Sequence, residues 1–403
     1  MIKLFFSFTI LILSTAEVFS QYNIVQKANV PGTLRNHASG FSINGKGYLG
    51  TGSAQMGAIL ADWHEYNPAT DAWTQKANFP GTPRTYAVGF SINGKGYITC
   101  GNTSSEYLNQ LWQYDPGTDT WLQKTAYPGA PRRHPCVAVV NGEAYVGCGD
   151  DSNGNNFDDF YKYNPTSDTW TAIADFPGTE RHHPVAVSLN NKLYVGTGHD
   201  LTGAKKTDFY VYDPAGNSWT SIAAIPGVGR IAPGGIAING KMLVMWGGNE
   251  GSTTYSDYFS YDPAASSWTA YTFTANVPLF ASVFFEINGK GYIGSGQYQG
   301  MNENVFYEIT DASTIGISNI PHTDVAVSVY SNPFYESATI SIQNSQSSEL
   351  KIFDVLGNTV RTFTIEPGNS NLNLGRKEFT AGIYFYKIFT GYSVIASGKL
   401  VVN

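Results

Sequence analysis

The sequence predicts an all-β protein built mainly from one repeated four-stranded unit. The composition joins apolar and turn-forming residues, with 42% hydrophobic and 14% aromatic residues beside 43 Gly and 19 Pro in 403 residues. Two sequence markers also recur with one common period along most of the chain. Only 14% of the residues are charged and the net charge is −7, which excludes a basic nucleic-acid-binding protein.

The first marker is a hairpin turn followed by a short aromatic strand. Asn-Gly favours a type I′ turn, because that turn needs positive φ at both central residues. The leading asparagines stand 48 or 49 residues apart, at Asn44, Asn93, Asn141, Asn190, Asn239 and Asn288. The second marker is a tryptophan that follows Tyr-Asn-Pro or Tyr-Asp-Pro, at Trp73, Trp121, Trp170, Trp219 and Trp268. Two markers that keep one period indicate an internal repeat.

Each repeat divides into four strands by local chemistry. In the second repeat we expect strands at residues 87–92, 95–101 and 111–114 and a fourth strand around Trp121. This repeat is one residue short between Asn93 and Tyr114, and we expect the deletion in the loop, where it costs least. A four-stranded antiparallel unit repeated about every 50 residues is typical of a β-propeller blade.

The two ends of the repeat array predict how the ring closes. The sixth repeat has its hairpin at Asn288 but no tryptophan strand after it. Residues 24–32 copy residues 73–81 of the first repeat, with Ile24 in the place of Trp73. We therefore predict a six-bladed β-propeller over residues 21–311, closed by the N-terminal strand.

These residues resemble the kelch repeat, in which a strand ending in Gly is followed by Tyr and then Trp at fixed offsets. The resemblance covers roughly residues 21–310 and implies a kelch-type propeller. One departure is that the double Gly of the family appears only at Gly247-Gly248. The other blades have one Gly, at Gly52, Gly101, Gly149, Gly198 and Gly296. A single Gly still permits the turn.

The N-terminal residues 1–20 read as a secretory signal peptide. Lys3 precedes an apolar run over residues 4–13, and Val18 and Ser20 suit the cleavage site. The alternative is an uncleaved anchor, but the run is far short of the roughly 20 residues that a bilayer needs. No later stretch is expected to span a membrane.

The odd number of cysteines, Cys100, Cys136 and Cys148, predicts that disulfides do not hold the fold.

The period stops after Thr310, and we expect a linker at residues 312–323 and a β-sandwich at residues 324–403. Short alternating strands are predicted at residues 325–330, 338–343, 350–353, 383–389 and 393–402. Four segments, at residues 330–334, 353–357, 381–384 and 398–402, resemble the C-terminal sorting domain of type IX secretion cargo. The resemblance implies recognition by that machinery and a product secreted from, or held on the outer surface of, a Gram-negative cell. The alternative is an ordinary accessory β-sandwich.

Comparison of the six blades with one another gives the candidate site. An arginine stands nine residues before the hairpin Asn in five blades, and Leu279 takes its place in the sixth. The arginines are Arg35, Arg84, Arg132, Arg181 and Arg230. Such regularity favours hydrogen bonds to loops of neighbouring blades, and ligand contact is the alternative.

The position two residues after the arginine varies, and therefore is where function can differ between blades. It holds His37, Tyr86, His134, His183, Ala232 and Ala281. We expect these residues to line one mouth of the central channel, where they would suit an anionic sugar or a carboxylate-bearing peptide. Partly solvated histidines at strand ends are the alternative. No metal is expected from the three histidines, because blades 1, 3 and 4 are not all adjacent.

Other signals for chemistry are weak. Residues 150–159 carry oxygen ligands at alternating positions, as calcium loops do, but lack the terminal Glu, so a solvated turn is preferred. No nucleophile, zinc-protease, phosphate or dinucleotide motif is present, and no cofactor is expected. Cys100 and Cys148 occupy one slot in adjacent blades and are predicted to be core thiols. We favour a binding module for a glycan or protein over the alternative, an enzyme resembling the six-bladed kelch sialic-acid mutarotases.

Overall fold

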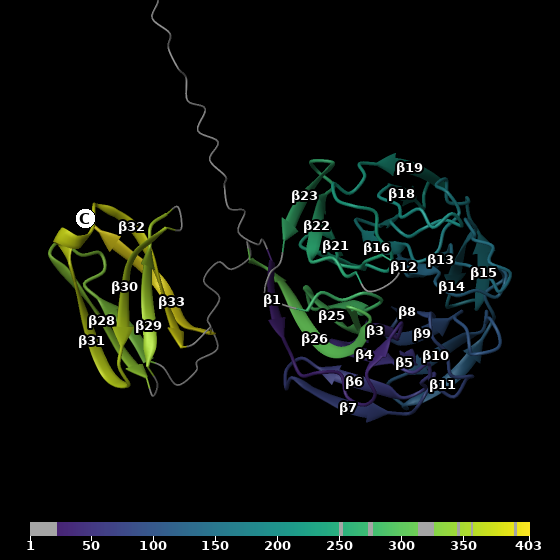
Figure 1. Ribbon diagram of the computed structural model, residues 1–403, viewed down its shortest axis with the longest axis horizontal. Coiled ribbons are helices and arrows are strands. Elements are labelled where there is room, and N and C mark those ends of the chain that lie inside the picture. The colour runs from purple at the N-terminus through teal and green to yellow at the C-terminus, as the bar shows by residue number, and fades with distance from the viewer. Residues whose placement is uncertain are drawn as a thin grey trace, which may run out of the picture. The chain divides into compact units, whose positions relative to one another are not determined.

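The computed structural model describes residues 22–249, 253–272, 277–312, 326–344, 347–355, 358–390 and 393–403. It divides into two compact units, one up to Ser313 and one from Thr314 (Figure 1). The predicted signal peptide and the part of the predicted linker beyond residue 312 lie outside the described residues. Within the described residues, no helix is long and apolar enough to cross a bilayer.

The first unit is a ring of six four-stranded antiparallel sheets around a central axis (Figure 1). The innermost strands are β3 (Ser39–Ile43), β8 (Val88–Ile92), β12 (Cys136–Val140), β16 (Val185–Leu189), β20 (Gly234–Ile238) and β24 (Val283–Ile287). The second strands are β4 (Lys46–Gly50), β9 (Lys95–Thr99), β13 (Glu143–Gly147), β17 (Lys192–Gly196), β21 (Lys241–Met245) and β25 (Lys290–Tyr298). Each inner strand contacts the inner strands of both neighbouring blades, including β24 against β3 across the closure.

The outer half of each blade carries the tyrosine and tryptophan markers. The third strands are β6 (Trp63–Asn67), β10 (Leu111–Asp115), β14 (Phe160–Asn164), β18 (Phe209–Asp213), β22 (Asp257–Asp262) and β26 (Met301–Asp311). The outermost strands are β7 (Ala72–Lys76), β11 (Thr120–Lys124), β15 (Thr169–Ala172), β19 (Ser218–Ile222), β23 (Ser267–Thr272) and β1 (Tyr22–Gln26). A short pair, β2 (Arg35–Asn36) and β5 (Ser53–Ala54), adds to the first blade.

The local turn chemistry matches the sequence prediction. Asn93 and Gly94 have φ of 51° and 73°, as a type I′ hairpin requires. The missing residue of the second blade falls in the loop between Thr99 and Leu111, as predicted. A single Gly also suffices at the kelch turn. Gly198 has φ of 80°, and a Cβ there would lie 2.6 Å from the His182 carbonyl oxygen.

The N-terminal strand closes the ring, which confirms the prediction. β1 pairs antiparallel with β26 of the sixth blade, and Ile24 lies opposite Ile309. In the first blade Trp73 lies opposite Tyr66 in the same register, so Ile24 does occupy the tryptophan position. Tyr22 on the same strand is 1% exposed, which ties the start of the chain into the core.

The repeated tryptophans hold neighbouring blades together. The Trp73 indole Nε1 donates to the Ala28 carbonyl at 2.9 Å, and the Ala28 amide donates to Asp71 Oδ1 at 3.0 Å. Tyr66 Oη donates to the same carboxylate oxygen at 2.8 Å. The indoles of Trp121, Trp170, Trp219 and Trp268 make the equivalent bond. These markers are therefore explained by architecture, and the site must be found elsewhere.

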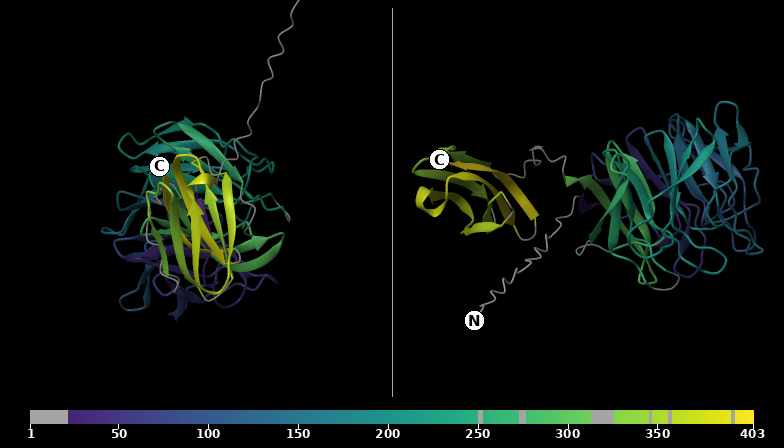
Figure 2. Two further views of the ribbon diagram at one scale, coloured as in Figure 1. Left: turned by 90° about the vertical axis from the view of Figure 1, so that its left-hand side faces the viewer. Right: turned by 90° about the horizontal axis from the view of Figure 1, so that it is seen from above.

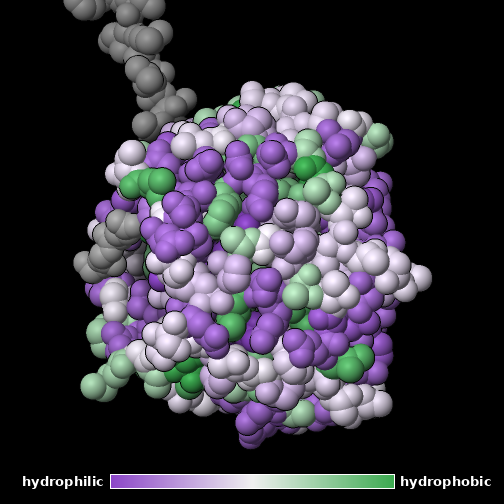
Figure 3. Space-filling model, turned by 90° about the vertical axis from the view of Figure 1, so that its right-hand side faces the viewer, coloured by the Kyte–Doolittle hydropathy of each residue, from purple (hydrophilic) through white to green (hydrophobic). Residues whose placement is uncertain are grey.

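On the face in Figure 3, hydrophobic residues lie scattered among hydrophilic ones.

The second unit is a β-sandwich of two antiparallel sheets (Figure 2). One sheet has the order β27 (Ala326–Tyr330), β28 (Ser337–Asn344), β31 (Gly368–Gly375), and the other has β30 (Thr359–Ile365), β29 (Ser348–Phe353), β32 (Gly382–Thr390), β33 (Ser393–Val402). Ile340 and Leu374 of one sheet and Ile352 and Ile388 of the other share one buried core. The sequence prediction missed β30 and β31. β31 is rich in Gly and Asn, which have weak strand propensity, whereas β30 is rich in Thr, Val, Phe and Ile, and its strand signal was overlooked.

Candidate ligand site at the propeller axis

Six equivalent residues form a backbone ring around the propeller axis. They are His37, Tyr86, His134, His183, Ala232 and Ala281, all with φ between 47° and 59°. The amide of each residue donates to the carbonyl of its equivalent in the preceding blade, at 3.0–3.2 Å, and the series closes on itself. This hydrogen-bonded ring fixes the starting points of the side chains near the axis.

The structure brings the four polar side chains of this ring together. The ring centroids of His134 and His183 lie 3.5 Å apart, and Tyr86 lies 4.2 Å from His37 and 4.1 Å from His134. His183 Nε2 lies 3.3 Å from His37 Nε2. Blades 1, 3 and 4 are not all adjacent, yet their axial histidines lie close together. Their inner ends meet because the circumference is smallest at the axis.

These side chains separate two cavities. A cavity of about 480 Å³ at the mouth is lined by Asn36, Arg133, His182, Ile231 and Phe280 together with the four polar ring residues. A channel of about 540 Å³ runs between the inner strands on the other side. His37, Tyr86, His134 and His183 line both cavities, so they form a constriction between the mouth and the channel.

Comparisons with known proteins agree with this geometry. A family model described as the KLHDC2/KLHL20/DRC7 Kelch-repeats domain matches residues 9–179, and the Secretion system C-terminal sorting domain matches residues 328–403. This chain is a kelch-repeat β-propeller protein with a type IX C-terminal sorting domain. The solved structure titled "Structure of YjhT" matches with a TM-score of 0.60 and 18% identity, over 70% of this chain and 97% of that chain. At that identity the likeness shows the fold alone. No curated protein matches the chain.

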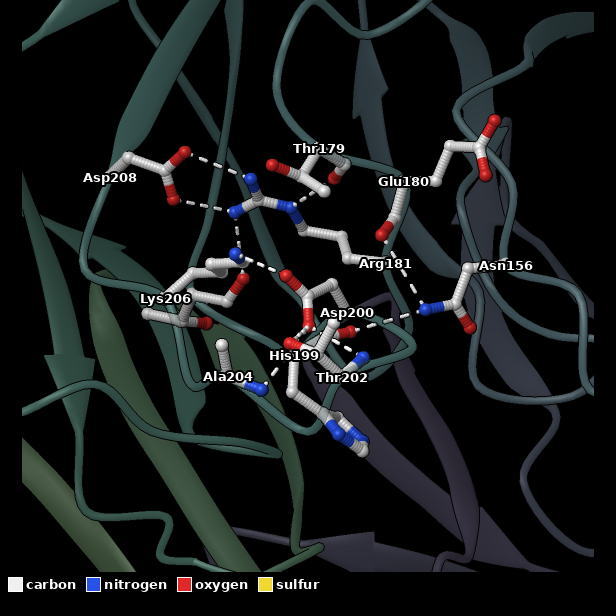
Figure 4. Close-up of polar contacts among 11 residues, drawn as sticks. Asn156, Thr179, Glu180, Arg181, His199, Asp200, Thr202, Ala204, Lys206 and Asp208 are labelled. Atoms are coloured by element: carbon white, nitrogen blue, oxygen red, sulfur yellow. Dashed lines mark hydrogen bonds and ion pairs between the residues drawn. The ribbon is translucent and has the colours of Figure 1, made fainter.

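The five repeated arginines are buried, and none of them lines the mouth cavity. Arg181 is 0% exposed and makes a bidentate pair with Asp208, at 2.6 and 2.8 Å (Figure 4). It also donates to the carbonyls of Thr179 and Thr197, and it packs over the Phe176 ring. The equivalent carboxylate pairs are Arg35–Asp62, Arg132–Asp159 and Arg230–Asp257. The guanidinium groups are thus occupied by protein partners.

Hydrogen bonds between these arginines and neighbouring blades were expected, and it is the arginine backbone carbonyl that makes them. The guanidinium groups bond within their own blade, whereas the Arg230 carbonyl accepts from the Gly198 amide of the preceding blade at 2.9 Å. Two blades depart from the carboxylate pair. Arg84 bonds Gln110 at 2.6 Å, and its burial lowers the pKa of the guanidinium to about 10. In the sixth blade Leu279 replaces the arginine.

Burial sets the charge of the site. It lowers the pKa of His37 and of His182 to about 3 and holds those of His134 and His183 well below their usual range. The four imidazoles are therefore neutral at pH 7. Burial also raises the pKa of Asp150 to about 6, against the lowering effect of Arg133.

The sequence comparison overlooked the position between the arginine and the axial residue. This position holds Asn36, Thr85, Arg133, His182, Ile231 and Phe280, and all except Thr85 line the mouth cavity. Arg133 donates to Asp150 Oδ2 at 2.9 Å and lies 5.5 Å from the Tyr86 ring centroid. Comparing this column across the six blades would have found these residues, because it varies as much as the axial one.

The remaining sequence candidates have structural explanations. In the loop over residues 150–159, Asp151 accepts from the amides of Asn153 and Asn155, both at 2.9 Å, and the homologous Asp200 accepts from Thr202 and Ala204. This pattern is that of the preferred solvated turn. All three cysteines are free and buried, and Cys100 and Cys148 were predicted to be core thiols. Burial raises the pKa of Cys100 to about 11, which disfavours a thiolate nucleophile.

Proposed function

We propose that this chain is an exported binding module whose kelch ring takes a glycan or protein partner at the histidine-lined mouth. The observation that carries the proposal is the chemical asymmetry of the mouth cavity. Blades 1–4 contribute most of the polar side chains, including Asn36, Arg133 and His182. Blades 5 and 6 contribute the large apolar side chains Ile231 and Phe280, with Gln297 as their one polar side chain among the described residues that line the mouth. A concave site with one apolar wall and a few convergent polar groups is typical of small-ligand sites.

The charge of the cavity favours a hydroxyl-rich ligand over a polyanion. The imidazoles are neutral, and the guanidinium groups of the buried arginines are engaged by protein partners. Arg133 is the one Lys or Arg side chain among the described residues lining the mouth, and Asp150 pairs with it. Neutral imidazole, amide and phenol groups donate to and accept from sugar hydroxyls, and Arg133 adds affinity for one carboxylate. A glycan with at most one acidic group therefore fits best.

The C-terminal unit supports the same role. A sorting domain of this kind implies contact with the type IX secretion machinery and export of the chain. We infer that the propeller is then released or held on the outer surface of a Gram-negative cell, where it meets extracellular glycans or proteins.

A carbohydrate-active enzyme, such as a sialic-acid mutarotase, is the second candidate. One observation favours it, namely that His134 Nδ1 lies 3.0 Å from Asp150 Oδ1 and the pKa of that carboxyl is about 6. A carboxyl that titrates near neutral pH, next to a histidine at a cavity, is suited to proton transfer. Accelerated exchange between the anomers of sialic acid in an NMR assay would support the enzyme and contradict pure binding.

A glycan array probed with the purified full chain tests the binding proposal. Every glycan that binds is then titrated against Tyr86→Ala, His183→Ala and a control, His64→Ala, whose side chain lies on β6 outside the mouth. Ala232 and Ala281 show that the backbone ring accepts alanine at the axial position. We expect each axial variant to weaken binding about tenfold, the worth of one or two hydrogen bonds, and the control to bind as before. Unchanged binding in both axial variants would place the ligand elsewhere.

A further inference from the structure

Histidines are concentrated at the propeller axis. Five of the seven in the sequence, namely His37, His134, His182, His183 and His199, belong to groups whose ring nitrogens lie within 4.8 Å of one another. His37, His134 and His183 form one such group and come from equivalent positions in three blades. The closed backbone ring holds all three in place, so their convergence needs no rearrangement of the fold.

A hydrogen bond to a carboxylate orients His134. Its Nδ1 lies 3.0 Å from Asp150 Oδ1, so the carboxylate accepts the Nδ1 proton and the Nε2 lone pair is exposed to the axis. His134 is 7% exposed, and its Nε2 has no hydrogen-bond partner among the described residues. Leaving a buried acceptor unpaired is unfavourable, and a bound ligand would recover that free energy.

His37 is oriented in the same way by an amide. Its Nδ1 lies 2.8 Å from Asn36 Oδ1. The Asn36 amide cannot flip without losing bonds, because Nδ2 donates to Asn302 Oδ1 at 2.7 Å and Ser53 Oγ donates to Oδ1 at 2.8 Å. His37 therefore also turns an Nε2 lone pair inward, towards His183 Nε2 at 3.3 Å. Two ligands about 2.05 Å from a tetrahedral zinc lie about 3.3 Å apart.

We propose that His37, His134 and His183 bind one divalent transition-metal ion, with zinc the best match, through their Nε2 atoms. Three imidazoles suit zinc, copper, iron or nickel, and with tetrahedral zinc they leave a fourth position open to water or a ligand. In the metal-free protein the proton between the two facing Nε2 atoms belongs to His183. On binding, this proton moves to His183 Nδ1, so no net proton is released. The inference stands apart from the proposed glycan role, since the metal is measured alone.

Two other groups share residues with this site but fit a metal less well. Asp150, in the group with His134 and His182, already accepts from Arg133 at 2.9 Å as well as from His134, and a metal would compete with these two bonds. The group of His182, His183 and His199 comes from one blade and does not use the inward-facing nitrogens of His37 and His134. His182 therefore provides the variant that separates the three sites.

The test is zinc binding by the purified full chain, stripped with a chelator and titrated in competition with a chromophoric chelator. We expect one zinc per chain, and a visible cobalt(II) spectrum of the intensity typical of tetrahedral sites. His37→Ala should weaken binding by at least about 100-fold, and Asp150→Asn by about 10–100-fold, because it weakens the hydrogen bond that orients His134. His182→Ala and His64→Ala should stay within about threefold of the unchanged chain.

The result that would overturn the proposal is zinc binding no tighter in the unchanged chain than in His37→Ala. Loss of binding in His182→Ala with retention in His37→Ala would equally overturn it, because the metal would then occupy another group. The fifth and sixth blades already have alanine at the axial position, Ala232 and Ala281, so we expect His37→Ala to fold. Tryptophan fluorescence checks that the variant is folded. Where His37→Ala fails to fold, the lack of a tetrahedral cobalt spectrum in the unchanged chain would still overturn the proposal.

Discussion

The buried arginine pair of the fourth blade gives the sharpest test of what the repeated arginines do. Arg181 is 0% exposed, whereas the Asp208 side chain is 37% exposed. The sixth blade offers an apolar version of this pair. Phe209 and Phe306 lie opposite Gly196 and Gly294, so Asp208 corresponds to Val305, just as Arg181 corresponds to Leu279. Arg181→Leu, Asp208→Val and the double variant therefore copy a packing that the fold already contains.

The expected costs follow from which charge is left behind. Asp208→Val leaves a fully buried guanidinium without its carboxylate and should lower the free energy of unfolding by about 3 kcal/mol, the lower end for a broken buried pair because Asp208 is partly exposed. Arg181→Leu leaves a carboxylate that water can reach and should cost about 2 kcal/mol. The double variant removes both charges and should cost about 2–3 kcal/mol, so the coupling energy is about 2 kcal/mol or more.

Urea unfolding followed by tryptophan fluorescence measures this directly. All eight tryptophans lie between Trp63 and Trp268, so the signal reports on the propeller and not on the sorting domain. Single costs that add up to that of the double variant within about 0.5 kcal/mol would refute the proposed coupling. So would an Arg181→Leu variant that unfolds like the unchanged chain but no longer binds its glycan, since the arginine would then serve the ligand.

Three further predictions use the same assay. The pKa values of His37 and His182 are lowered in the fold, so their stabilisation is present above the unfolded pKa of about 6.5 and is lost as the pH falls. Each lowers the free energy of unfolding by about 1.4 kcal/mol per pH unit below that value. The urea midpoint of His37→Ala should therefore fall less steeply from pH 7 to pH 5 than that of the unchanged chain. Asp150 has the opposite sign, because its raised pKa adds stability as the pH falls from about 6 to 4. Gln110→Glu should stabilise the second blade by about 1 kcal/mol by giving Arg84 a charged acceptor, and an unchanged or lower midpoint would contradict this. Tyr22→Ala should cost about 3–5 kcal/mol at the ring closure, whereas Val25→Ala on the same strand, 53% exposed, should cost under about 0.5.

The position that holds the arginine in five of the six blades shows what a closer comparison of the blades could have predicted. Two blades depart from the Arg–Asp pair. In the second blade Gln110 takes the place of the Asp opposite Arg84, and in the sixth blade Leu279 and Val305 replace both members of the pair. Residues that change together in two columns indicate contact. The sequence therefore held a signal for the buried pairs, and the expectation of side-chain bonds to neighbouring blades overlooked it.

The sequence by itself determined the repeat, the six blades and the closing strand, because turn chemistry at Asn-Gly and the spacing of Trp73 and its equivalents are local and periodic. It also ranked the axial residues as variable. Only the tertiary structure decided that His37, His134 and His183 meet, because residues some 50 to 150 positions apart converge where the inner strands reach the axis. It likewise decided that the arginine side chains are buried and bound to protein partners and that the histidines are neutral, because burial and hydrogen-bond partners depend on packing between distant segments.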